Sequence, residues 1–109
     1  MSTTTTTTAI NVTFVDNELY IIAIPNTGLA AYQIFHYVSG YNDRMNVTIV
    51  PQHVLPAGKY TLQFIGINWG GPANFTASLT TGGAVSPVGP AVSSNAVGIV
   101  WSPTVAIDV

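Results

Sequence analysis

The sequence predicts an all-β domain, an antiparallel β-sandwich with jelly-roll-like connections and about eight short strands. Two observations carry this prediction. Apolar and polar residues alternate with a period of two in most segments, which is typical of strands with one buried face. Clusters of glycine, proline, asparagine and aspartate interrupt these segments about every ten residues, which is the spacing of antiparallel sandwiches and barrels.

The first half of the chain contains four of the expected strands. Alternation runs from Ile10 to Phe14, and the turn Asp16-Asn17 separates this segment from a continuous apolar one. The segment after the turn at 25–28 could also form a helical stripe, but it has no charged residues to solvate an outer helix face, so we interpret it as a strand. The four expected strands cover residues 10–14, 19–24, 29–38 and 45–49.

The second half continues the pattern after turns at 56–58 and 70–72. The stretch 55–62, Leu-Pro-Ala-Gly-Lys-Tyr-Thr-Leu, resembles the turn and strand of many extracellular β-sandwich modules, which supports the fold class. Residues 82–90 contain too much glycine and proline for regular structure, so we expect a loop there. The remaining expected strands cover residues 60–64, 75–79, 97–101 and 104–109.

The chain divides into a short arm and one domain. Residues 1–8 are a polar threonine tract that cannot bury apolar surface, so we expect a disordered arm, or alternatively an arm that orders against a neighbouring subunit. Residues 9–109 have the length of a single β-sandwich domain. The inward-facing side chains expected to form its core are Val12, Phe14, Ile21, Val47, Ile49, Tyr60, Leu62, Phe64, Phe75, Leu79, Ile99 and Ile107.

The unusual feature of the composition is its low charge. Charged residues make up 6% of the 109 residues, against roughly a quarter in ordinary soluble domains. With a net charge of −2 and two basic residues, the chain has few cationic groups to bind the phosphates of a nucleic acid or an anionic membrane surface. We therefore expect neither nucleic acid nor such a membrane surface as a partner. No apolar run approaches the ~20 residues of a membrane span. The chain has no cysteine, which excludes disulfides and thiolate metal sites.

The start of the chain bears on its localisation. Met1 and Ser2 are followed by threonines, without the basic and apolar regions of a secretory signal. If Met1 is the native start, we expect a cytosolic protein or one that is exported without such a signal.

Patterns for catalysis and metal binding are weak. The two histidines, His36 and His53, are not accompanied by a Gly-x-Ser-x-Gly elbow, and His36 within an apolar strand is better explained as a hydrogen-bonded core or sheet-face residue. The oxygen-rich segments 16–18 and 42–43 are candidates for calcium, but both first indicate turns. We therefore expect no enzyme, no metal and no cofactor.

Two loops, residues 39–44 and 68–72, combine an aromatic side chain with planar hydrogen-bonding groups. A sugar presents apolar C–H faces and a ring of hydroxyls, so its recognition needs an aromatic platform together with planar donors and acceptors. The alternative is that the two aromatic residues fold back onto the core. The residues expected to bind a ligand are Tyr41, Asn42, Asp43, Arg44, Asn68 and Trp69, with Trp69 partly exposed.

These observations favour a non-catalytic binding module of lectin type, an oligomeric β-sandwich that recognises a neutral carbohydrate. Hydroxyl and amide side chains in place of charges protect a surface only weakly against self-association. We therefore expect a saccharide and other copies of the chain, in a homo-oligomer, as the partners. The alternative function is a structural subunit of a coat, a fibre or another ordered assembly, which the low charge and the threonine arm suit equally well.

Overall fold

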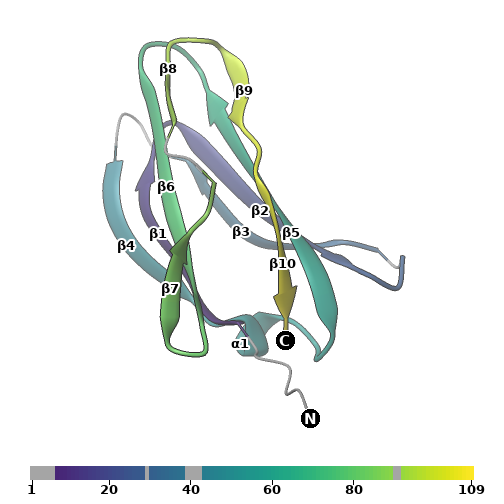
Figure 1. The fold of residues 1–109 in the computed structure, drawn as a ribbon. Helices are drawn as coiled ribbons and strands as arrows, with labels where there is room; N and C mark the ends of the chain where they lie inside the picture. The colour runs from purple at the N-terminus through teal and green to yellow at the C-terminus, as the bar shows by residue number, and fades with distance from the viewer. Residues whose placement is uncertain (1–6, 29, 39–42, 90–91) are drawn as a thin grey trace.

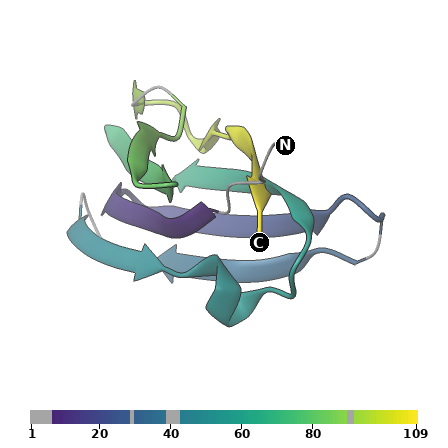
Figure 2. The same cartoon turned by 60° about the horizontal axis from the view of Figure 1, so that its bottom comes forward.

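The computed structural model describes residues 7–28, 30–38, 43–89 and 92–109. Within these ranges, residues 43–44 and 92–94 are described by their backbone alone. Within these ranges the chain forms ten strands in two antiparallel sheets and one short helix (Figure 1). The views of Figures 1 and 2 show the two sheets lying face to face. The predicted all-β sandwich is therefore confirmed.

In each sheet four strands lie side by side, and a short fifth strand pairs with one of the two inner strands. Sheet 1 has the order β4 (Asp43–Ile49), β1 (Thr7–Val15), β6 (Ala73–Thr81) and β7 (Ala84–Pro87), and β8 (Val92–Ser94) also pairs with β6. Sheet 2 has the order β10 (Thr104–Asp108), β5 (Lys59–Asn68), β2 (Glu18–Pro25) and β3 (Tyr32–Val38), and β9 (Gly98–Trp101) also pairs with β5.

The core lies between the sheets, where alternate residues of each strand point inward. The indole of Trp101 stacks on Phe75 with ring centroids 5.6 Å apart and meets Phe64 edge-on at 5.6 Å. Gly66 packs directly against this cluster: a Cβ at this position would come within 2.9 Å of the Phe75 ring, so a larger residue would not fit. Of the predicted core, the buried residues are Val12, Ile21, Ile49, Tyr60, Leu62, Phe64, Phe75 and Ile107.

The other predicted core residues depart from that pattern to different degrees. Val47 and Leu79 are half-buried, and Phe14 is half-buried because a register shift between Val12 and Phe14 interrupts the alternation of β1. The prediction for Ile99 is wrong: its side chain is 65% exposed. Ile99 pairs with Ile67 across β9 and β5, and Ile67 belongs to the outward-facing set of β5.

Three local features differ from the expected elements. The predicted loop 82–90 contains the strand β7, so that part of the prediction is wrong. The helix α1 (Pro51–Val54) was not expected; proline fits its first turn, and the exposed His53 lies in its last. Of the predicted arm, Thr7 and Thr8 belong to β1, and residues 1–6 lie outside the described part of the chain.

The two ends of the sandwich are built differently. At one end the turn Asp16-Asn17 joins β1 of sheet 1 to β2 of sheet 2, and the backbone N–H of Asn17 donates to the Ile67 carbonyl at 3.2 Å. At the other end lie α1 and the carboxyl terminus (Figure 1). There Gly58 and Val109 exchange two backbone hydrogen bonds of 2.8 Å, which tie the start of β5 to the end of the chain.

Candidate functional site

The exposed indole of Trp69 stands immediately after β5, at the Asp16-Asn17 end of sheet 2. It is 52% exposed, which confirms the prediction for this residue. Its position follows from the alternation along β5, where Asn68 points inward and is fully buried. The backbone N–H of Trp69 donates to the Asn17 side-chain oxygen at 2.8 Å, so the turn between the sheets fixes the start of this loop.

Asn68 is engaged by the loop backbone. Its amide nitrogen donates to the carbonyls of Gly71 at 2.8 Å and Ala96 at 2.6 Å, and its oxygen accepts from the Gly70 N–H at 3.2 Å. With no solvent exposure and these three bonds, Asn68 holds the Trp69 loop in shape. We therefore regard it as a residue that positions Trp69.

A carboxylate–imidazole pair lies on the outer face of the neighbouring strands. Glu18 begins β2, and His36 lies on the paired strand β3 directly opposite Tyr20. His36 Nε2 lies 2.7 Å from Glu18 Oε2, and because a carboxylate can only accept, Nε2 carries the donated proton. The two side chains are 34% and 17% exposed, respectively, so the pair is open to a ligand from solvent.

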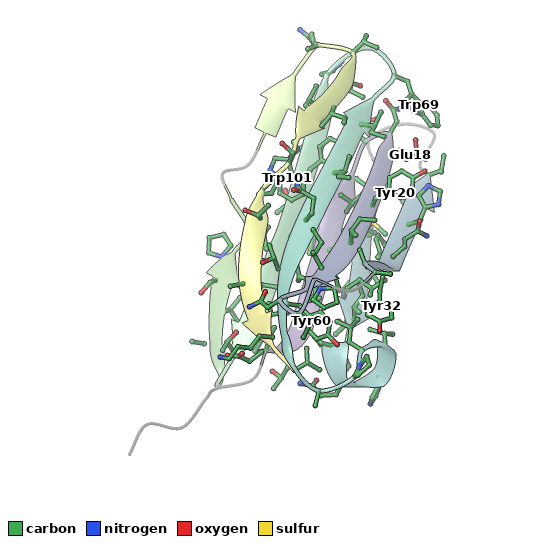
Figure 3. The ribbon with its side chains drawn as sticks, turned by 90° about the vertical axis from the view of Figure 1, so that its right-hand side faces the viewer. Glu18, Tyr20, Tyr32, Tyr60, Trp69 and Trp101 are labelled. Atoms are coloured by element: carbon green, nitrogen blue, oxygen red, sulfur yellow. The ribbon has the colours of Figure 1, made fainter. Side chains whose placement is uncertain are left out.

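Tyr20 completes the arrangement beside this pair. Its ring stacks on the His36 imidazole with centroids 4.1 Å apart and an interplanar angle of 12°. The alternation of β2 places Tyr20 two residues after Glu18 on the same face of the sheet. Figure 3 shows Glu18 and Tyr20 close to Trp69, at the end of the molecule opposite Tyr32 and Tyr60. We call Glu18, Tyr20, His36 and Trp69 the Glu18 cluster.

The electrostatics of the cluster centre on the carboxylate. The hydrogen bond from His36 is the largest cause that lowers the pKa of Glu18 below its usual 4.5; partial burial opposes it, and hydrogen bonds from Tyr20 and Trp69 add to the lowering. The same carboxylate raises the pKa of the Tyr20 hydroxyl above its usual 10.0, chiefly through their hydrogen bond. Glu18 is therefore ionised at neutral pH, and its hydrogen bond with His36 fixes the position of the imidazole beside Tyr20.

The other residues expected in the site have different positions. Tyr41 and Asn42 lie outside the described residues. Asp43 and Arg44 begin β4 in sheet 1, where their backbones pair with Val15 and Phe14. Among the six residues expected to bind a ligand, Trp69 is therefore the one whose side chain the structure describes as exposed on the outer face of sheet 2.

Sequence reasoning did not assign Glu18, Tyr20 and His36 to the site. The expectation that His36 is a hydrogen-bonded sheet-face residue is confirmed, but its partner depends on which strands pair. The signal in the sequence was the spacing of Glu18 and Tyr20, which places a carboxylate and an aromatic ring on one face of a strand.

A cavity of about 290 Å³ lies at the opposite end of the molecule. Tyr32, Tyr60, Pro25 and Pro56 contribute to its walls, and the ring centroids of the two tyrosines are 6.4 Å apart, edge to face. Two of its polar groups already have partners: the Tyr60 hydroxyl donates to the Pro56 carbonyl at 2.7 Å, and Lys59 pairs with Asp108 at 3.2 Å. Although it is the better enclosed space, we favour the Glu18 cluster, which combines an exposed ring with accessible polar atoms.

The described residues contain no group of three or more histidine, cysteine, aspartate or glutamate side chains that could hold a metal ion. In the same residues no helix is long and apolar enough to cross a membrane. No protein-family model matches the chain, and neither a curated protein nor a solved structure shows significant similarity to it. The functional argument therefore depends on the geometry of the Glu18 cluster.

Proposed function

We propose that this protein is a non-catalytic binding module that recognises a neutral carbohydrate at the Glu18 cluster. The observation that carries the proposal is the indole of Trp69, which is half exposed and lies close to a carboxylate that His36 holds in place by a 2.7 Å hydrogen bond (Figure 3). A sugar needs an apolar ring face to rest on and acceptors for its hydroxyls, and this cluster offers both on one sheet face.

The chemistry of the cluster fits hydroxyl groups better than charged ligands. A carboxylate has about four lone-pair sites, so Glu18 keeps an acceptor site for a ligand hydroxyl even with His36, Tyr20 and Trp69 around it. The negative charge of Glu18 disfavours anionic ligands. The partners of Glu18 are in place before any ligand arrives, which reduces the entropy lost when the ligand binds.

A glycan array followed by titration tests the proposal. We expect a neutral saccharide to bind and to change the fluorescence of the exposed Trp69. Trp69→Ala should weaken binding at least tenfold with an unchanged circular dichroism spectrum, and Trp69→Phe should retain part of the affinity because a ring remains. Tyr32→Ala is the matched control, since Tyr32 is an exposed aromatic residue, 43% accessible, at the other end. An array without hits, or equal losses in Trp69→Ala and Tyr32→Ala, contradicts the proposal.

One observation favours assembly as the second candidate function. The strand β7 is at the edge of sheet 1, all four of its residues are exposed and uncharged, and Val85 is 68% accessible. Sheet edges of this kind pair readily with other chains, and a lysine on the edge is a common protection. If β7 forms the contact of an ordered assembly, light scattering shows a species larger than 11.4 kDa and Val85→Lys returns it to the monomer. A wild-type monomer at high concentration contradicts this candidate.

A further inference from the structure

A strip of aliphatic side chains borders the Glu18 cluster on the side of β5 and β9. Ile67 and Ile99 are directly opposite each other in the paired strands, and Ile67 is also opposite Glu18 in the β2–β5 pair. Val97 precedes β9 and Trp69 follows β5, so the antiparallel pairing brings these two residues to the same end. Ile99 and Val97, two positions apart in the chain, are 65% and 72% exposed, so two large aliphatic side chains close together in the sequence face solvent.

Trp69 therefore stands at a boundary between two kinds of surface. Glu18, Tyr20 and His36 supply polar atoms on one side of it, and the strip formed by Ile67, Val97 and Ile99 supplies none on the other. The three strip side chains carry no charge. A ligand that covers both sides must itself have a hydroxyl-rich part and an apolar part, in contact with each other.

We propose that the carbohydrate bound by the Glu18 cluster carries an apolar aglycone, such as an alkyl chain, which lies on Ile67, Val97 and Ile99. This inference depends on the proposed function, because the sugar sets the position of the aglycone. Continuity supports it: Glu18, which anchors the cluster, and Ile99 of the strip are both cross-strand neighbours of Ile67. Desolvation of the strip adds affinity in proportion to the apolar area covered.

Paired glycosides test the inference. The methyl and n-octyl glycosides of glucose, galactose, mannose and N-acetylglucosamine are titrated below the micelle concentration, with octanol as the probe without a sugar. For the sugar that binds, we expect the octyl glycoside to bind about tenfold more tightly than the methyl glycoside. Ile99→Thr, which keeps a β-branched side chain in β9, should remove most of this difference. Ile24→Thr is the control, because Ile24 is 40% exposed on the same sheet at the far end of β2.

The outcomes separate this inference from the proposed function. If a methyl glycoside binds and its octyl partner binds no better, the sugar site stands and the aglycone inference is overturned. If octanol binds as well as every octyl glycoside, or if no glycoside binds, the proposed function fails and the inference fails with it. If light scattering shows a dimer that Ile99→Thr dissociates and that excludes the octyl glycosides, the strip is an interface between two copies, which also overturns the inference.

Discussion

The outer faces of the two sheets differ in chemistry although the strands beneath them share one core. The outer face of sheet 1 carries hydroxyl and amide side chains, namely Asn11, Thr13, Asn46, Thr48, Thr76 and Ser78. The outer face of sheet 2 carries several large apolar or aromatic side chains among polar ones such as Thr61 and Gln63, namely Tyr20, Ile22, Ile24, Ile65, Ile67 and Ile99. The first face is already suited to water, and the second gains free energy when something covers it.

The polar face also satisfies much of its own hydrogen bonding. The Asn11 amide donates to the Thr48 hydroxyl at 3.2 Å across β1 and β4, and the Thr13 hydroxyl donates to the Thr76 carbonyl at 3.4 Å. On sheet 2 Glu18 and His36 lie beside Tyr20 at one end, whereas Thr61, Gln63 and the Lys59–Asp108 pair lie toward the other end. The proposed recognition site lies on sheet 2, where polar and apolar side chains meet near Trp69.

The strongest test of this comparison contrasts the two faces of β5. Phe64 points into the core and is fully buried, whereas its neighbour Ile65 points outward and is half-buried. Phe64→Ala should lower the free energy of unfolding by about 3–5 kcal/mol, because it leaves a cavity beside Trp101. Ile65→Thr should cost less than about 1 kcal/mol, since it removes little buried area. Urea denaturation measures both, and comparable losses would show that the outer face of sheet 2 is part of a packed interface.

The turn Asp16-Asn17, which joins β1 of sheet 1 to β2 of sheet 2, provides the second test. Asp16 is fully buried, and neither of its carboxylate oxygens has a hydrogen-bond partner among the described residues. Because a buried polar group without a hydrogen-bond partner is costly, Asp16→Ala should raise the free energy of unfolding by about 1–3 kcal/mol. Glu18→Ala is the matched control, since it makes the same truncation at a carboxylate that has a partner. A loss of stability in Asp16→Ala would show that the carboxyl group of Asp16 makes a stabilising interaction.

Much of the fold was predictable because inward and outward positions alternate in the sequence. In the segments 10–14 and 60–64 the alternation predicts which side chains are buried. The one departure in these two segments is Phe14, where a register shift interrupts the alternation. The pattern fails for Ile99, because β9 is apolar at every side chain and alternation cannot identify the inner face. β7 was missed for a related reason, since it forms by pairing with β6 and its own residues are all exposed.

The candidate site was less predictable because it depends on strand pairing. Trp69 could be found from its own loop, where small residues leave the indole uncovered. The Glu18–His36 bond joins residues 18 positions apart, and it requires Tyr20 to be opposite His36 in the β2–β3 register. Cross-strand register is set by tertiary packing, so the sequence identifies the residue types on each strand and leaves their partners undetermined.

The third test addresses the hydrogen bonds of the polar face. Asn11→Ala removes the donor to Thr48 and should lower the free energy of unfolding by about 0.5–1.5 kcal/mol. The reciprocal Thr48→Ala and the double variant complete a mutant cycle, which isolates the coupling of the pair from the loss of each side chain. A coupling energy near zero in urea denaturation would show that water replaces this bond, and the face would then be merely solvated.

The smallest effect we expect is the pH dependence of the Glu18 cluster. The pKa of Glu18 is lower in the folded state than its usual 4.5, chiefly because of the His36 hydrogen bond. The folded state therefore binds fewer protons there than the unfolded state, so the stabilisation is present above about pH 4.5 and is lost as the pH falls through the folded-state value. The effect is below about 1 kcal/mol, because both side chains are partly exposed to water and ions screen the pair.

Melting temperatures of wild type and Glu18→Gln between pH 7 and pH 3 measure this effect. The other carboxylates contribute equally to both proteins, so their contribution cancels in the difference between the two melting temperatures. We expect wild type to be the more stable at pH 7 and the two curves to converge below pH 4.5, whereas a constant difference would show that Glu18 acts through packing alone.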